Sequence, residues 1–339
     1  MADVARVPAG PKIREWSRKH GFDDWMVARI VKLAGQSGLP SGSLPKLLDG
    51  LTRKAPQYVR ANPLRCDRDE MTKRLEARGF RIRRCPLDNQ MVEVLDAPIS
   101  SGATQEHLLG MTTPQDLASS AAPLALDVQP GDVVADLAAA PGIKSLHVAG
   151  SLQGKGSLVC VEPDPDRMRG LRFNLERCGV ANAITREEAA QDIPGEAWAD
   201  KVLLDAPCTG EGTLPKDRSR RRGDPAEIGQ LADLQAELLD AADRILKPGG
   251  VLAYATCTFA PEENEAQVQR MIERGYTVEP LPFDKCIAPW AAASPNGPAW
   301  SLMPACPRRR ASSPGFTRHL ASTWRACARG VRNARADLR

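Results

Sequence analysis

The second half of the sequence repeats one pattern, in which a short apolar run is followed by a turn and then by an amphipathic segment. Strands are expected at 132–137, 157–161, 183–185, 201–205 and 251–256. Helices are expected at 144–149, 166–178 and 228–246, with another starting in the acidic run 261–265. Parallel strands need such crossover helices, so the pattern predicts an α/β fold with a doubly wound, mainly parallel, Rossmann-like sheet.

The remaining sequence divides into three further regions. Apolar residues at helical spacing predict an N-terminal helical region over 1–56. The order strand, helix, strand, strand predicts a small α+β unit over 57–110. Arginines crowd its strands and suit contact with RNA phosphates, although they could also be ordinary surface charge: Arg60, Arg65, Arg81, Arg83 and Arg84. The α/β domain is expected over 111–304, and 305–339 is an arginine-rich tail.

Two cysteines follow two of the expected strands. Cys208 lies in the run Asp205-Ala206-Pro207-Cys208, and Cys257 lies in Thr256-Cys257-Thr258. Ligands of open α/β sheets bind outside the carboxyl ends of the strands, so both thiols and the Asp205 carboxylate are expected to meet in one cleft. This constellation predicts nucleophilic catalysis, and the residues alone leave open which thiol attacks.

The turn after the first strand of this domain predicts the kind of cofactor. It reads Ala138-Ala139-Ala140-Pro141-Gly142-Ile143-Lys144, which is neither a dinucleotide-binding Gly-x-Gly-x-x-Gly nor a phosphate-binding loop. Glu162 ends the second strand, where an acid can hold ribose hydroxyls. Small residues and an acid in these places favour S-adenosylmethionine, a nucleoside without phosphates.

Taken together, these segments resemble the signatures of the Nop2/Sun family of RNA cytosine-5 methyltransferases. The resemblance covers about 58–304 and includes the run Asp136 to Ser145, both cysteine segments and the acidic run after Cys257. Weaker matches occur at 60–65 and 114–119, and 102–115 is most similar to archaeal transfer-RNA enzymes. The resemblance implies methyl transfer to carbon 5 of cytosine through a covalent adduct, with transfer RNA as first candidate substrate and ribosomal RNA as second.

The resemblance also implies roles for individual residues. Cys257 would be the nucleophile, Cys208 would assist product release, Asp205 would hold the cytosine, and Lys144 would also be catalytic. The residues that it places around the cofactor are Ala138, Ala139, Ala140, Pro141, Gly142, Ile143, Lys144, Glu162, Arg167, Glu188 and Asp205.

Three features depart from the family pattern. Ala138 replaces a usual Cys, and Ile143 replaces a Gly, which would strain the turn if that position had a positive φ. The tail from Cys306 lacks the expected final apolar strand and is either a diverged RNA-binding segment or the product of an altered reading frame. Loss of that strand would leave a sheet edge exposed.

Charge and cysteine usage indicate the partner and the compartment. Residues 121–300 carry a net charge of −9, whereas the flanking regions carry +5 and +8, which favours an anionic partner held by the flanks. The run 216–222 is also basic and could hold the RNA backbone. The absence of Cys-x-x-Cys pairs, of an 18-residue apolar run and of a signal peptide predicts a cytoplasmic protein without metal or membrane contact.

Two other functions remain open from the sequence. Methylation of an exocyclic amine would need no cysteine nucleophile. A non-catalytic RNA-binding or assembly factor would be consistent with Ile143 and the unusual tail.

Overall fold

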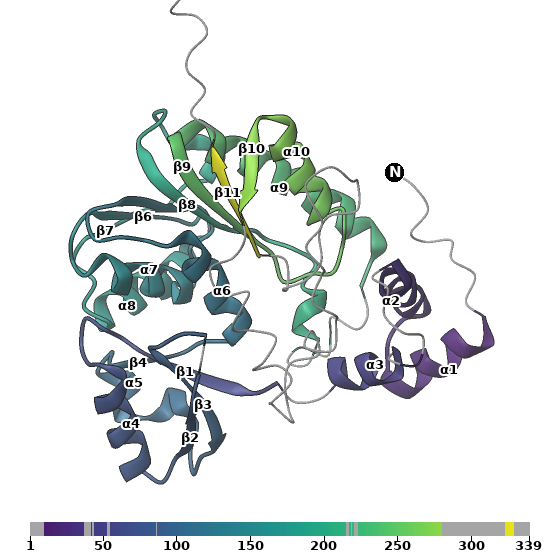
Figure 1. Ribbon diagram of the computed structural model, residues 1–339, viewed down its shortest axis with the longest axis horizontal. Helices are drawn as coiled ribbons and strands as arrows, with labels where there is room; N and C mark the ends of the chain where they lie inside the picture. Colours follow the sequence, from purple (N-terminus) through teal and green to yellow (C-terminus); the bar gives the residue numbers. More distant parts are fainter. Residues whose placement is uncertain are drawn as a thin grey trace, which may run out of the picture.

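The computed structural model describes residues 10–36, 42, 44–52, 55–85, 87–214, 217, 219, 223–279 and, for the backbone alone, 323–328. The strands of the larger sheet are β5 (Val133–Asp136), β6 (Ser157–Val161), β7 (Ala183–Arg186), β8 (Ala199–Asp205), β9 (Leu246–Ala255), β10 (Tyr276–Glu279) and β11 (Thr323–Ala328). Their order is β10-β11-β9-β8-β5-β6-β7. The pairs from β7 to β9 are all parallel, which confirms the predicted doubly wound α/β sheet (Figure 1).

Helices cover both faces of this sheet. They are α6 (Leu117–Leu126), α7 (Ile143–Leu152), α8 (Pro165–Arg177), α9 (Pro225–Ile245) and α10 (Glu265–Glu273), with short 3-10 turns η4 (Ala190–Asp192) and η5 (Glu211–Thr213). Neighbouring strand residues face opposite sides: Leu203 packs in one buried cluster with residues of α6, α7 and α8, while Val202 packs in another with α9 and α10. This alternation is typical of strands buried on both faces.

Strand β11 comes from the segment that was predicted as a basic tail. It pairs antiparallel with β9 on one side and with β10 on the other. The edge of β9 that was expected to be exposed is therefore covered by β11. The sequence did not predict this strand, because backbone pairing needs no apolar pattern.

The small α+β unit has a four-stranded antiparallel sheet. Its elements are β1 (Gln57–Ala61), α4 (Arg68–Ala77), β2 (Arg81–Arg84), β3 (Met91–Asp96), η3 (Ser101–Ala103), α5 (Gln105–Leu108) and β4 (Thr112–Pro114). The strand order is β2-β3-β1-β4. Strand β4 lies beyond the boundary predicted at residue 110, so the small sheet extends to Pro114.

Three helices form the N-terminal region: α1 (Pro11–His20), α2 (Asp24–Gln36) and α3 (Leu44–Thr52). Their apolar faces share one buried cluster, which includes Val27 and Leu48. Leu214 and Phe259, from the two loops that carry the cysteines, pack against the same cluster. The N-terminal helices, on the right in Figure 1, therefore pack against the loops that follow β8 and β9.

Candidate active site

The two cysteine-bearing loops leave neighbouring parallel strands and meet. Asp205 at the end of β8 is in register with Ala255 at the end of β9, and the Ala206 N–H donates to the Ala255 carbonyl at 2.9 Å. Beyond these residues the chain turns so that the sulfur atoms of Cys208 and Cys257 lie 3.1 Å apart. The predicted meeting of the two thiols at one edge of the sheet is thus confirmed.

The two thiols have different surroundings. Cys257 is exposed, whereas Cys208 is partly shielded and its sulfur accepts the Cys257 backbone N–H at 3.1 Å. The hydrogen bond with Cys257, together with burial, raises the pKa of the Cys208 thiol well above its ordinary value. Cys208 is thus shielded beside a sulfur that solvent can reach, a distinction that the sequence could not make.

Backbone contact holds these loops close together. The Gly212 N–H donates to the Cys257 carbonyl at 2.7 Å, and a Cβ added at Gly212 would lie 2.9 Å from that oxygen. Only glycine allows this approach without displacement.

Lys144 and Asp205, both predicted as catalytic, form an ion pair. Lys144 is the second residue of α7, and its Nζ contacts Oδ2 of Asp205. Asp205 ends β8, so the pair lies at the edge of the sheet where the cysteine loops begin, and both side chains retain some exposure.

The turn predicted to surround the cofactor is tightly closed. The Ala139 N–H donates to the Val161 carbonyl at 2.9 Å, and the Gly142 N–H donates to the Ala139 carbonyl at 2.7 Å. Gly142 has φ +101° and caps α7. Ile143 is the first residue of the helix and does not have a positive φ. The condition under which Ile143 would strain the turn is not met, because Gly142 alone takes the left-handed conformation.

The predicted ribose acid, Glu162, lies beside this turn. Its side chain is 1% exposed, and its Oε1 accepts from Nη1 of Arg167 at 3.2 Å. Nη2 of the same arginine donates to the Ala140 carbonyl at 2.9 Å. Arg167 thus joins the turn after β5 to the acid after β6, two segments that were both predicted to contact the cofactor.

Glu188, predicted near the adenine, follows β7, whose carboxyl end lies at the same edge of the sheet as that of β6. Its Oε1 accepts from Nε of Arg186 at 2.6 Å, and its side chain is 26% exposed. The neighbouring Glu187 instead pairs with Arg172. No contact joins Glu188 to the turn or to Glu162 among the described residues, so its role remains a prediction.

Asp136, at the end of β5, is a buried acid with an unused acceptor. Its Oδ2 accepts from the Ser145 hydroxyl at 2.7 Å, while its Oδ1 has no hydrogen-bond partner among the described residues. Burial raises the pKa of the Asp136 carboxyl to about 6 from an ordinary 3.8, although the Ser145 hydrogen bond opposes this shift. A buried acceptor without a partner at this edge suits the polar end of a ligand.

The raised pKa of Asp136 predicts a pH-dependent stability. Below pH 3.8 the group is protonated in both states and contributes nothing; above about pH 6 it must ionise while buried. Its ionisation then lowers the free energy of unfolding by about 3 kcal/mol. We expect Asp136→Asn to gain that amount over wild type between pH 4 and pH 7, measured by urea unfolding at each pH. A difference between the proteins that does not change with pH would contradict this expectation.

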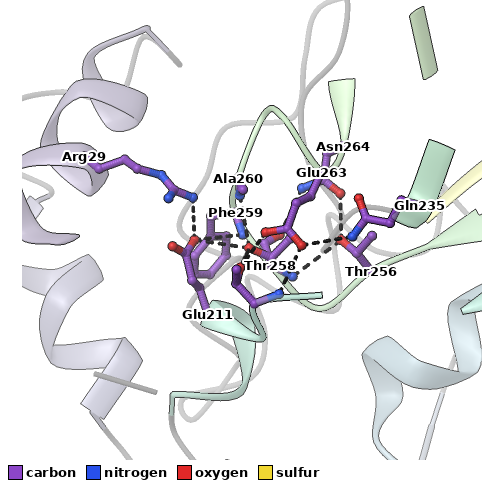
Figure 2. Close-up of polar contacts among 10 residues, drawn as sticks. Arg29, Glu211, Gln235, Thr256, Thr258, Phe259, Ala260, Glu263 and Asn264 are labelled. Carbon is purple, nitrogen blue, oxygen red and sulfur yellow. Dashed lines mark hydrogen bonds and ion pairs between the residues drawn. The ribbon is translucent and has the colours of Figure 1, made fainter. Parts of the chain in front are cut away.

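Sequence reasoning missed a set of polar residues, most of them buried, that connect the two cysteine loops with each other and with neighbouring helices (Figure 2). They are Arg29, Thr209, Glu211, Gln235, Thr258, Glu263 and Asn264. The acidic run 261–265 was predicted to start a helix, but α10 begins only at Glu265. Glu263 lies in the preceding turn and is fully buried. The acidic residues after Cys257 were the only available signal, and their burial could not be foreseen.

Several arginines of the small unit are paired with acids. Arg60 is buried, and its Nε lies 3.3 Å from Oδ2 of Asp88, which also faces His147 of α7. Arg83 pairs with Glu93 at 2.5 Å. The expectation that Arg60 contacts phosphate is therefore wrong, because its guanidinium is enclosed where the small unit meets α7. The basic run 216–222 lies outside the described residues, apart from Asp217 and Ser219.

Within the described residues, no helix is long and apolar enough to cross a membrane. The same part of the chain contains no group of three or more His, Cys, Asp or Glu side chains placed to hold a metal ion.

Comparison with known proteins identifies the family. A family model described as 16S rRNA methyltransferase RsmB/F matches residues 123–296, which include the turn after β5 and both cysteine loops. The chain belongs to the RsmB/F family. This membership confirms the predicted resemblance to Nop2/Sun proteins.

The names of two relatives of this RsmB/F chain refer to two kinds of RNA. It is 35% identical over 241 residues to ribosomal RNA small subunit methyltransferase F of Vibrio parahaemolyticus, covering 68% of this chain and 50% of the relative. It is 39% identical over 171 residues to tRNA (cytosine(72)-C(5))-methyltransferase of Pyrococcus horikoshii, covering 50% and 43%. The chain thus spans half or less of the length of these relatives.

A solved structure supports the fold of this RsmB/F chain. A methyltransferase homolog protein from Pyrococcus horikoshii matches with a TM-score of 0.70 and 32% identity, covering 80% of this chain and 86% of the other.

Proposed function

We propose that this chain transfers a methyl group from S-adenosylmethionine to carbon 5 of a cytosine in RNA. The observation that carries the proposal is the cysteine pair, in which an exposed Cys257 sulfur lies 3.1 Å from a shielded Cys208 thiol. Methylation of an amine or a hydroxyl needs no such nucleophile, whereas carbon 5 of cytosine is too weak a nucleophile without one.

The residues at the strand ends fit S-adenosylmethionine. The small side chains of Ala138, Ala139 and Ala140 leave room beside the turn, and Glu162, oriented by Arg167, can accept from ribose hydroxyls. Asp136 offers a buried oxygen without a partner, and Lys144 offers a cation to a carboxylate. When bound, S-adenosylmethionine supplies an electrophilic methyl group.

The cysteines and Asp205 would make the cytosine reactive. Addition of the Cys257 thiolate to carbon 6, with uptake of a solvent proton at nitrogen 3, makes carbon 5 nucleophilic. Asp205 stabilises this adduct by accepting a hydrogen bond from the N–H at nitrogen 3, until the proton returns to solvent on release. Once carbon 5 carries the methyl group, a base removes its proton and the bond from sulfur to carbon 6 breaks. This restores the Cys257 thiolate, and Cys208 lies close enough to assist the release.

Support for the acceptor is divided between two RNA classes. Transfer RNA is the first prediction from sequence, and the Pyrococcus relative bears a tRNA name. The family model and the Vibrio relative bear rRNA names. A test should therefore offer both acceptors side by side.

The test is to incubate the protein with radiolabelled S-adenosylmethionine and unmodified 16S rRNA or tRNA, then digest the RNA and separate the nucleosides. We expect label in 5-methylcytidine from one of the two RNAs. Label in an N4-methylated cytidine would replace this proposal with amine methylation. RNA binding without label in either RNA would favour a non-catalytic RNA-binding factor.

A further inference from the structure

Two buried carboxylates lie directly behind the cysteine pair, and each ties one cysteine loop to the other. Glu211 follows Cys208 in sequence, yet its Oε2 accepts from the Phe259 N–H at 3.2 Å and lies 3.3 Å from the Thr258 hydroxyl. Glu263 follows Cys257, yet its oxygens accept from the Thr209 N–H at 3.0 Å and the Thr209 hydroxyl at 2.6 Å. The links are reciprocal.

Further contacts support this crossed arrangement. The hydroxyl of Thr209 bonds to Glu263 and that of Thr258 to Glu211, and the two hydroxyls lie 2.7 Å apart. Gln235 of α9 donates to Glu263 at 2.9 Å and to the Pro207 carbonyl at 2.8 Å. The residues next to both cysteines, Thr209 and Thr258, are therefore held by these carboxylates.

Within the described residues, Glu211 but not Glu263 forms an ion pair, and its positive partner comes from the N-terminal helices. Nη2 of Arg29 in α2 donates to Oε2 of Glu211 at 2.8 Å, across 182 residues of sequence. The two side chains are only 7% and 6% exposed. Burial raises the pKa of the Glu211 carboxyl, and Arg29 opposes that rise, so the arginine favours the charged acceptor that binds the Cys257 loop.

We propose that Arg29 is a positioning residue for the cysteine pair, acting through Glu211. Without the guanidinium, Glu211 would be an unpaired buried charge and would turn toward solvent or take up a proton. Either response weakens its bonds to Thr258 and Phe259 and loosens Cys257 relative to Cys208. The N-terminal helices thus form part of the active-site framework, an inference that rests on the proposed function only for its effect on turnover.

The test measures the geometry of the thiols without RNA or cofactor. Dibromobimane becomes fluorescent when it joins two neighbouring thiols, and the signal that remains in Cys257→Ser is subtracted as background. We expect Arg29→Met to slow this crosslinking about tenfold. Lys32→Met, which removes an exposed cation from the same helix, should crosslink like wild type.

A rescue separates positioning from general loss of structure. In Arg29→Met/Glu211→Gln no buried charge is left unpaired, and the amide oxygen can still accept from Thr258 and Phe259. We expect the double variant to fold as wild type by circular dichroism and to regain at least half of the crosslinking rate. Normal crosslinking in Arg29→Met, or no gain in the double variant, would overturn the proposal.

Turnover supplies the second readout. We expect Arg29→Met to lower kcat for methyl transfer about tenfold, with the KM for RNA within twofold of wild type, and the double variant to recover in parallel with its crosslinking. An effect confined to KM would show that Arg29 acts on RNA binding and would overturn positioning. If wild type transfers no methyl group while the crosslinking results hold, the proposed function fails and the positioning role stands.

Discussion

Cys257→Ala is expected to reduce methyl transfer by a factor on the order of 10⁴ or more, because the reaction loses its nucleophile. The substitution removes an exposed sulfur, so the fold should be unaffected. The rate of label transfer to RNA measures the effect, and the melting temperature shows that the protein is intact.

Cys208→Ala provides the matched comparison, since it removes the other sulfur of the same pair. We expect this variant to form the bond between Cys257 and cytosine but to release it slowly, so a covalent complex of protein and RNA should accumulate on denaturing gels. Absence of that complex would contradict the role of Cys208 in release, and its appearance in Cys257→Ala instead would show that the two cysteines have exchanged roles.

Gly110→Ala is expected to lower the free energy of unfolding by about 3 kcal/mol. Gly110 has φ +70°, and a Cβ there would lie 2.1 Å from the Arg177 carbonyl oxygen at the end of α8. Asn62 bridges the same junction, because its Nδ2 donates to the carbonyls of Gly110 and Cys178 at 2.8 Å. The added methyl group must push the small unit away from α8.

Gly154→Ala isolates the conformational part of this effect. Gly154 has a similar φ of +74°, but nothing lies within 4 Å of its Cβ position. We expect a loss of about 1 kcal/mol for this variant, measured by the same urea unfolding. Equal losses at Gly110 and Gly154 would contradict the close packing of the small unit on α8.

Much of the fold and the centre of the site followed from local patterns. Apolar runs at 157–161 and 201–205 predict strands because a parallel sheet buries both faces of each strand. The meeting of Cys208 and Cys257 was predictable because parallel strands present their carboxyl ends at one edge. Family resemblance then supplied roles that geometry alone does not assign.

Residues whose partners are remote in sequence could not be predicted in this way. Arg60 was expected to contact phosphate, and charge alone does not reveal that Asp88 encloses it in the interior. The possible strain at Ile143 depended on which residue of the turn takes the left-handed conformation, and the structure assigns that conformation to Gly142. Strand β11 could not be predicted from the sequence pattern, because its pairing uses backbone groups that nearly every residue type provides.

The sequence by itself therefore determined the parallel strands with their crossover helices and the meeting of the two cysteines, because each depends on periodicity or on the common edge of a parallel sheet. Only the tertiary structure decided how the cysteine loops are held together. Arg29 and Glu211 are 182 residues apart, and Glu263 reaches back to Thr209 across 54 residues. No local pattern records such pairs, since burial of a charge becomes favourable only once the folded chain has brought its partner beside it.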